Sequence, residues 1–381
     1  MFPDKLHNKL SKRIENDSLR TLGKENNLVD FSSNDYLGFA KSDVIFKNTH
    51  QFLIENDLVI NGSTGSRLLS GNHSLYTALE KQLCQWHQSE ASLIFNSGYN
   101  ANLGFFSCVP QRGDVILYDE YSHASIRDGI QLSHSKSYKF HHNNLKDLKR
   151  LLARYSELNV HIYVVTESVF SMDGDSPNLI AIVNLCKQYN ANLIVDEAHA
   201  VGVFGIGLVQ TLNFEEEVFA RIVTFGKALG CHGAAVLGSR QLIDYLVNFS
   251  RPFIYTTGLS PHSLVAIKCS YEELVNSYKE EKSHSSSNQL KNNIQFFSQL
   301  LEKQYQQLNF IKCKSAIQSC IISGNEKVKS IAGQLQKKGF DVKPILSPTV
   351  PEGEERLRFC LHSYNTQEQI AQVLALLCKF A

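Results

Sequence analysis

The chain has 381 residues, of which 43% are hydrophobic, 10% aromatic and 20% charged, and its 38 Lys and Arg residues nearly balance 37 Asp and Glu residues. This composition excludes a disordered chain, and the length can bury the cores of one large and one smaller domain. The formal net charge of +1 provides no long-range field, which disfavours binding to nucleic acid or to a membrane through bulk charge.

The cysteines and the N-terminus indicate the compartment. The nine cysteines are odd in number and include no Cys-x-x-Cys pair. Disulfide frameworks and structural zinc sites need paired spacings, so the sequence predicts reduced thiols and no metal site. Residues 1–17 contain no apolar stretch of signal-peptide length, and a run of about 18 apolar residues occurs nowhere in the chain. We therefore expect a cytoplasmic protein.

The first two thirds of the chain predict an α/β fold. Near the N-terminus, Leu6, Leu10 and Ile14 are spaced as on one face of a helix. Further along, short apolar segments alternate with amphipathic ones; these segments are 92–95, 115–118, 162–168, 191–197, 221–225 and 234–238. Segments that are apolar throughout are typical of strands covered on both faces, so we predict a mostly parallel central sheet flanked by helices. One linking helix is expected over 144–155, capped by Asn143 or Asn144.

The last third of the chain predicts a smaller α+β domain. The polar, serine-rich stretch 279–289 is the best linker candidate. After it we expect strands at 320–324, 340–346 and 356–361, a helix from about Lys327 to Lys338 ended by Gly339, and a closing helix from about Thr366 to Phe380. The predicted domains are an N-terminal helix and extended segment at 1–45, a large α/β domain at 46–282 and a small α+β domain at 283–381.

The tetrapeptide Asp-Glu-Ala-His at 196–199 is the first candidate for chemistry, because it directly follows an apolar segment. Open α/β sheets bind their ligands at the C-terminal ends of buried parallel strands. As the acidic motif of an ATPase, it would need an upstream G-x-x-x-x-G-K-[ST] loop. Neither Gly-Lys pair of the chain continues into Ser or Thr, so the sequence disfavours this interpretation.

The other interpretation connects Asp196 with Lys227, which follows the apolar segment 221–225. A lysine here is either a surface residue at a strand end or a functional amine, since a buried ammonium is costly unless it is paired or neutralised. Thr224 supplies a hydroxyl, and small residues follow the lysine, so a phosphate and a planar ring can approach the backbone. An aspartate for a pyridine nitrogen, a lysine for a Schiff base and hydroxyls for a phosphate together indicate pyridoxal phosphate.

Eight segments, in order and with compatible spacing, resemble the α-oxoamine synthases, a family of fold type I pyridoxal-phosphate enzymes. They are 31–40, 65–80, 96–104, 118–129, 166–179, 195–205, 224–239 and 347–361. The likeness runs from about Leu19 to the C-terminus. Within the family, the segments most resemble the branch that makes 8-amino-7-oxononanoate in biotin biosynthesis.

The resemblance implies a role for each matching residue around pyridoxal 5'-phosphate. Lys227 would hold the cofactor as an internal aldimine and move the α-proton, while Asp196 would pair with the pyridinium nitrogen. His199 and Ser171 would bind the phenolic oxygen, and His123 would stack on the ring. The implied phosphate ligands, of which the last two are alternatives reaching in from a neighbouring subunit, are Gly98, Tyr99, Thr224, Thr256 and Thr257.

The resemblance also implies a set of substrate-binding residues: Arg20, Asn34, His123, Thr349 and Arg358. Arg358 would bind the carboxylate of the amino acid, a task suited to a planar bidentate donor. Arg356 shares the same face of its strand, so the choice between the two arginines comes from the family and not from spacing. The segment between Arg20 and Asn34 looks shorter than is usual in the family.

The implied reaction is the decarboxylative condensation of L-alanine with pimeloyl-CoA, or with a pimeloyl carrier protein, through an external aldimine and a quinonoid. The enzyme would be a homodimer with shared active sites. A sibling α-oxoamine synthase that uses glycine or serine with another acyl-CoA would share every catalytic residue named above. A non-catalytic pyridoxal-phosphate-binding or scaffold protein is expected to have lost Lys227, Asp196 or Arg358, and the chain retains all three.

Overall fold

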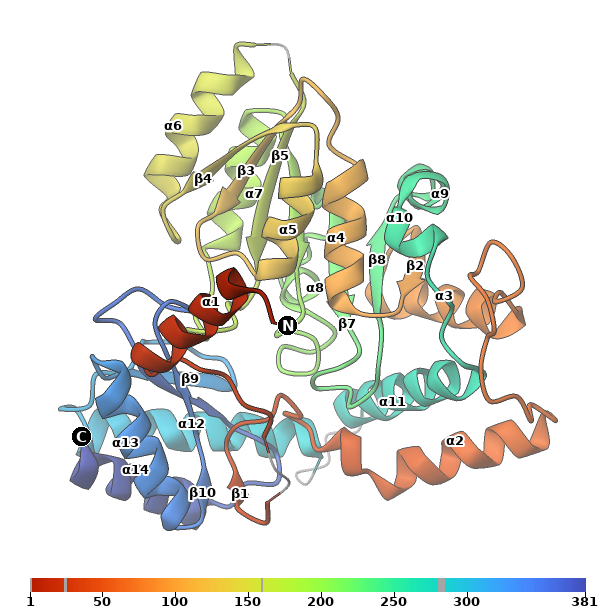
Figure 1. Ribbon diagram of the computed structural model, residues 1–381. Coiled ribbons are helices and arrows are strands. Elements are labelled where there is room, and N and C mark those ends of the chain that lie inside the picture. The colour runs from red at the N-terminus through yellow and green to blue at the C-terminus, as the bar shows by residue number, and fades with distance from the viewer. Residues whose placement is uncertain (1, 24–25, 159, 280–284) are drawn as a thin grey trace. The chain divides into compact units, whose positions relative to one another are not determined.

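The structure is a computed structural model that describes residues 2–23, 26–158, 160–279 and 285–381 (Figure 1). The described residues form two compact units. The large unit comprises residues 34–171 and 176–288, and the small unit comprises 1–33, 172–175 and 289–381. The domains predicted from the sequence are 1–45, 46–282 and 283–381; in the structure, residues 34–45 belong to the large unit, and the predicted boundary between 282 and 283 lies outside the described residues.

A seven-stranded sheet with the order β2-β8-β7-β6-β5-β3-β4 forms the centre of the large unit. Neighbours from β7 to β4 are parallel, whereas β8 is antiparallel to both β2 and β7. The strands are β2 (Ala91–Phe95), β3 (Val115–Asp119), β4 (Lys136–Phe140), β5 (Ile162–Glu167), β6 (Asn192–Asp196), β7 (Ala220–Thr224) and β8 (Ala234–Gly238). The predicted mostly parallel α/β sheet is therefore confirmed.

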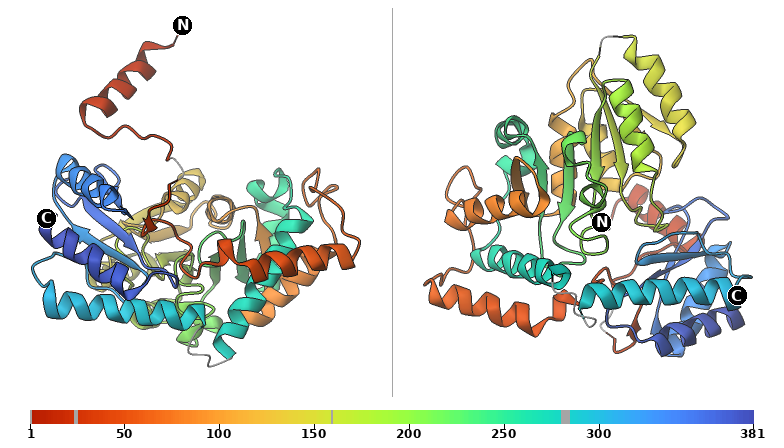
Figure 2. Two further views of the ribbon diagram at one scale, coloured as in Figure 1. Left: turned by 90° about the horizontal axis from the view of Figure 1, so that it is seen from below. Right: turned by 180° about the vertical axis from the view of Figure 1, so that it is seen from behind.

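Helices cover both faces of this sheet. Successive residues of a strand point to opposite faces, so neighbouring residues of one strand pack against different helices. Ile194 packs into one hydrophobic cluster and Val195 into the other. Helices α4 (Gly98–Cys108) and α5 (Ala124–Leu132) cover the face seen in Figure 1, whereas α6 (Leu145–Ser156) and α7 (Leu179–Gln188) cover the face seen from behind in Figure 2. The other helices of the unit are α2 (Asp43–Glu55), α3 (Ser74–His87), α8 (Leu208–Thr211), α9 (Arg240–Phe249), α10 (Arg251–Ile254) and α11 (Pro261–Lys279).

The apolar segments found in the sequence correspond to six of the seven strands, and the linking helix over 144–155 corresponds to α6. Asn144 caps α6, since its Oδ1 accepts from the backbone N–H of Asp147 at 3.0 Å. Strand β4 is not predicted by the sequence pattern. This edge strand is largely exposed and has the polar sequence KSYKF, so it lacks the continuous apolar pattern of a buried strand.

The small unit is α+β, as predicted. Its antiparallel sheet has the order β11-β12-β9, and a separate parallel pair joins β1 to β10. The strands are β1 (Val29–Asp30), β9 (Ile317–Ile321), β10 (Phe340–Asp341), β11 (Lys343–Ile345) and β12 (Arg356–Cys360). The helices are α1 (Asp4–Glu15), α13 (Asn325–Lys337), α14 (Gln367–Phe380) and most of α12 (Ser286–Gln304).

Three expectations for this part of the chain need correction. The strand expected at 320–324 begins earlier, at Ile317. The strand expected at 340–346 is divided, because β10 pairs with β1 while β11 pairs with β12. Of the expected linker 279–289, Lys279 ends α11 and Ser286 begins α12, and residues 280–284 lie outside the described residues. No helix in the described part of the chain is long and apolar enough to cross a membrane.

Candidate active site

The predicted cofactor residues of the large unit gather where parallel strands end. Asp196 is the last residue of β6, Thr224 is the last residue of β7, and Lys227 follows shortly after. His123 lies between β3 and α5, whose N-terminus it caps. Because parallel strands all end at the same edge of a sheet, these side chains come from different segments to one place.

Lys227 takes part in a chain of hydrogen bonds that passes through two buried side chains, His199 and Tyr36, to Asn34. Its Nζ lies 2.6 Å from Nε2 of His199, and Nδ1 of His199 lies 2.7 Å from the hydroxyl of Tyr36. The Tyr36 hydroxyl donates to Oδ1 of Asn34 at 3.1 Å. A hydroxyl has a single proton, so Tyr36 accepts from Nδ1–H of His199, and Nε2 is then an acceptor facing the amine of Lys227.

Asp196 is buried, and both of its carboxylate oxygens accept hydrogen bonds. Oδ2 accepts from Nδ2 of Asn102 at 2.8 Å, and Oδ1 accepts from the backbone N–H of Ala198 at 2.8 Å. Nδ2 of Asn102, on α4, also lies 3.1 Å from Oγ of Ser125, on α5. The orientation of the carboxylate is thus fixed by two helices and by its own strand end.

The backbone and ring of His123 are both held. Its backbone N–H donates to Oε1 of Glu167 at 2.6 Å, and its ring Nδ1 accepts from the backbone N–H of Ser125 at 3.2 Å. Burial lowers the pKa of His123; the carboxylate of Asp196 opposes this shift, and the cation of Lys227 adds to it. The ring is therefore favoured in its neutral form, which suits stacking on an electron-poor ring better than a cation would.

The N-terminus of α4 and the end of β7 adjoin. A Cβ added at Gly98 would lie 3.6 Å from both Cβ and Oγ1 of Thr224. Oγ1 of Thr224 also donates to the backbone carbonyl of Gly233 at 3.1 Å. Tyr99 is the second residue of α4, and its hydroxyl donates to the carboxylate of Asp128. A helix N-terminus beside a hydroxyl is a suitable place for a phosphate, because the N–H groups and the helix dipole both favour an anion.

The remaining predicted cofactor residues are less closely tied to this cluster. The backbone of Thr257 pairs with Ser66, and its carbonyl oxygen accepts from Nδ2 of Asn96 at 2.5 Å, directly before the cap of α4. Thr256 is half-buried and Thr257 is exposed. Ser171 is half-buried in the loop that follows β5.

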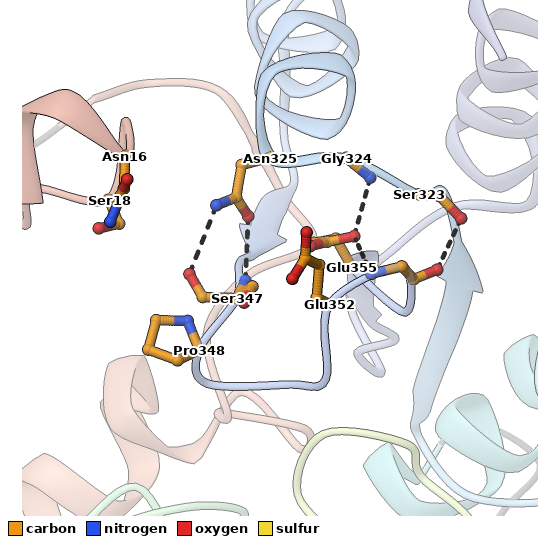
Figure 3. Close-up of a pocket in the computed structure, with 10 residues that line it drawn as sticks. Asn16, Ser18, Ser323, Gly324, Asn325, Ser347, Pro348, Glu352 and Glu355 are labelled. Carbon is orange, nitrogen blue, oxygen red and sulfur yellow. Dashed lines mark hydrogen bonds between the residues drawn. The ribbon is translucent and has the colours of Figure 1, made fainter.

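In the small unit, the structure brings together two residues predicted to bind the acyl donor. Nη2 of Arg20 lies 3.4 Å from Oγ1 of Thr349, although 329 positions separate them in the sequence. Thr349 directly follows Pro348, which lines a cavity of about 670 Å³ (Figure 3). On the other side of this cavity, Oε2 of Glu355 accepts from the backbone N–H groups of Gly324 and Gly353 at 2.8 and 3.1 Å.

The two arginines of β12 have different surroundings. Arg356 is almost fully buried, forms an ion pair with Asp173, and donates from Nε to the carbonyl oxygen of Glu354 at 2.9 Å. Arg358 is only half-buried. The guanidinium of Arg356 thus has a structural ion pair, and Arg358 is the better candidate for binding a carboxylate that arrives from solution.

Four residues at the site were not predicted as site residues: Tyr36, Asn102, Ser125 and Glu167. All of them lie within segments that carry the resemblance, but only Glu167 had its own signal. It ends the apolar segment that forms β5, just as Asp196 ends the one that forms β6. The same rule about carboxylates at strand ends would have found it.

Comparison with known proteins places these residues in a family context. A family model described as aminotransferase class I and II matches residues 26–377. The chain is 37% identical over 361 residues to a putative 8-amino-7-oxononanoate synthase of Halalkalibacterium halodurans, covering 93% of this chain and 87% of the relative. It is also 37% identical over 364 residues to the 8-amino-7-oxononanoate synthase of Emericella nidulans, covering 91% and 87%.

Solved structures show the same fold. Serine palmitoyltransferase of Sphingomonas wittichii matches with a TM-score of 0.83 and 28% identity, covering 92% of this chain and 86% of that one. The 8-amino-7-oxononanoate synthase of Francisella tularensis matches with a TM-score of 0.77 and 27% identity, covering 93% and 98%.

Proposed function

Because the chain belongs to the class I and II aminotransferase family, and within it to the α-oxoamine synthases, we propose that it makes 8-amino-7-oxononanoate for biotin biosynthesis. It is a pyridoxal-phosphate-dependent acyltransferase. The proposed substrates are L-alanine and pimeloyl-CoA, or a pimeloyl carrier protein, which are joined with loss of carbon dioxide. The relatives named for this product, at 37% identity, support this choice. The solved structures of serine palmitoyltransferase and of 8-amino-7-oxononanoate synthase, at 28% and 27% identity, match about equally well and leave the choice of substrates to the assay below.

The chemistry of the side chains in the large unit fits the cofactor. A buried carboxylate at Asp196 suits the protonated ring nitrogen, and an amine at Lys227 suits the aldehyde. Thr224 and the N-terminus of α4, with Gly98 and Tyr99, suit the phosphate. When bound, the ring withdraws electrons and stabilises negative charge on the α-carbon of the amino acid.

The observation that carries the proposal is that Nζ of Lys227 lies 2.6 Å from Nε2 of His199. His199 is the last residue of the 196–199 motif, which Asp196 begins. A lysine amine that faces a neutral imidazole acceptor can hold a proton and return it, as removal and replacement of the α-proton require. We assign this proton transfer to Lys227. His199, held by Tyr36, and Ser171 are assigned to the phenolic oxygen of the cofactor, and His123 to the face of its ring.

We assign substrate binding to the five residues that the resemblance implies. Arg358 would bind the carboxylate of alanine, since its side chain is half-buried and accessible to a ligand, whereas Arg356 is buried. Asn34, the acceptor at the end of the Lys227 hydrogen-bond chain, would contact the amino acid together with His123. Arg20 and Thr349, which hydrogen-bond each other, would contact the acyl donor.

We also propose a homodimer, in which Thr256 or Thr257 reaches the phosphate bound by the neighbouring subunit. Large apolar side chains are exposed along residues 44–69 of the large unit: Val44, Phe46, Ile54, Val59, Ile60, Leu68 and Leu69. A concentration of exposed apolar groups in one segment indicates a protein interface. Light scattering during size-exclusion chromatography tests this, and a monomer at micromolar concentration would contradict it.

The substrate proposal is tested by measuring thiol release across glycine, alanine and serine, each combined with short, dicarboxylic and long acyl-CoA thioesters. We expect the highest kcat/KM for L-alanine with pimeloyl-CoA. A preference for serine with a long acyl chain would instead identify the sibling reaction. If the protein binds the cofactor but releases no thiol from any of the thioesters, a non-catalytic protein would be supported.

The covalent assignment has a separate test. Lys227→Ala is expected to purify without the yellow, borohydride-reducible link between cofactor and protein, because no other amine occupies this position. The unlinked variant should still fold, since Lys227 is only half-buried. A reducible link that persists in Lys227→Ala would overturn the assignment.

A further inference from the structure

Glu167 is a second buried carboxyl beside Asp196, and the function proposed above does not use it. The two residues end neighbouring parallel strands and are register partners, so their side chains leave the sheet on the same face. Glu167 is 3% exposed. Two ionised carboxylates on register partners of neighbouring strands repel each other. The repulsion is removed when one of the two carboxyl groups is neutral.

The contacts of Glu167 show what it holds. Its Oε1 accepts the backbone N–H of His123 at 2.6 Å, at the point where α5 begins. A backbone N–H only donates, so this bond requires an acceptor oxygen and does not require a negative charge. An uncharged carboxyl or a carboxamide can fill the same place.

The charged and titratable groups that face Glu167 come from each neighbouring element. They are Asp196 at the end of β6, Asp119 at the end of β3, Lys227 after β7, and His123 at the start of α5. Burial raises the pKa of Glu167 to about 8, and the two aspartates add to this shift, while Lys227 and the N–H of His123 oppose it. At neutral pH the balance therefore favours the protonated form.

We propose that Glu167 is a positioning residue that anchors the His123 loop as a neutral carboxylic acid, leaving Asp196 as the anion for the cofactor ring. The role of His123 in this proposal rests on the proposed function, whereas the protonation of Glu167 does not. A neutral Glu167 fixes the loop without adding a second negative charge beside the ring nitrogen site.

The first test compares Glu167→Gln with Glu167→Leu. Gln keeps an acceptor at the position of Oε1 and carries no charge, while Leu is of similar size and offers no acceptor. In the apoprotein titrated with pyridoxal phosphate at pH 7, we expect Gln to bind within about threefold of the unmodified protein and Leu to bind about tenfold or more weakly. The induced circular dichroism of the bound cofactor, which reports how the ring is held, should be retained by Gln and reduced by Leu.

The second test uses pH and applies even if Glu167→Leu does not fold. A carboxyl whose pKa is raised in the folded protein keeps its proton there at pH values at which the unfolded chain has lost it. Its contribution to stability therefore falls as the pH rises from about 4.5 to about 8, and it does not change further above pH 8. Gln removes this contribution. The melting temperature of the Glu167→Gln apoprotein, relative to that of the unmodified protein, should therefore rise across this range and level off above pH 8.

Two outcomes would overturn the proposal. One is a melting difference that does not change with pH, which would mean that Glu167 ionises normally. The other is a Glu167→Gln variant that binds cofactor as weakly as Glu167→Leu, which would mean that the charge is needed. Both measurements use no substrate, so they distinguish this proposal from the choice of alanine and pimeloyl-CoA. If the apoprotein binds no pyridoxal phosphate at all, the proposed function fails while the pH test still decides the state of Glu167.

Discussion

Tyr36→Phe isolates the hydrogen bond that orients His199. Tyr36 is fully buried, and the substitution removes one hydroxyl without changing the ring that fills the space. Nδ1 of His199 then loses a partner at 2.7 Å, and Oδ1 of Asn34 loses a donor at 3.1 Å. The imidazole is no longer restricted to the tautomer in which Nε2 accepts from Lys227.

The expected magnitude follows from the loss of a buried hydrogen bond to a polar ring. Such a loss costs about 1–3 kcal/mol, and about 1.4 kcal/mol corresponds to a factor of ten. We therefore expect the free energy of unfolding to fall by about 1–2 kcal/mol and kcat to fall about tenfold, with a smaller change in the KM for the amino acid. Thiol release under saturating substrates measures kcat, and thermal melting measures stability.

The chain offers a matched control in Tyr271→Phe. Tyr271 is also fully buried, and its hydroxyl lies 2.8 Å from Nε2 of His87, outside the hydrogen-bond chain from Lys227 to Asn34. This control should lose similar stability and retain kcat. If Tyr36→Phe keeps its full kcat, or if both variants lose kcat in proportion to stability, then the hydrogen-bond chain from Lys227 to Asn34 has no specific role.

Three further substitutions test the partners of the cofactor and the substrate. Asp196→Asn should retain bound cofactor and lose about a hundredfold or more in kcat, because an amide does not stabilise a protonated ring nitrogen; a nearly unchanged rate would contradict its assignment. Arg358→Lys should raise the KM for alanine about tenfold, because the bidentate contact is lost. Arg356→Lys, which disturbs the buried pair with Asp173, should mainly lower the melting temperature; the opposite pattern for these two variants would exchange their roles.

The sequence predicted those strands and helices whose own residue pattern depends on whether they are buried. Strands β5 and β6 are buried on both faces, so their apolar segments could be recognised without knowing their neighbours. The edge strand β4 could not be recognised, because exposure allows it polar residues. The division of 340–346 depends on β1, more than 300 residues away, and no local pattern reports such a partner.

The site shows the same division. The placement of Asp196 and Lys227 at or just after the ends of buried strands could be predicted, because each follows an apolar segment. Tyr36 could not, since its hydroxyl gains a role only where it meets His199, 163 positions along the chain. The contact between Arg20 and Thr349 likewise depends on folding, although the resemblance had assigned both residues to the same substrate.

The ends of β5 and β6 illustrate why residue type alone does not define a role at this site. Asp196 and Glu167 carry the same functional group at register-paired positions. Asp196 accepts from the side chain of Asn102 and the backbone of Ala198, whereas Glu167 is more deeply buried and accepts the N–H of His123. Replacing a carboxylate by its amide is therefore expected to lower kcat about a hundredfold or more at Asp196 and to change cofactor binding by no more than about threefold at Glu167. The different hydrogen-bond donors and burial at the two strand ends are the reason that we propose an anion for a cofactor ring at one of them and an uncharged anchor for a loop at the other.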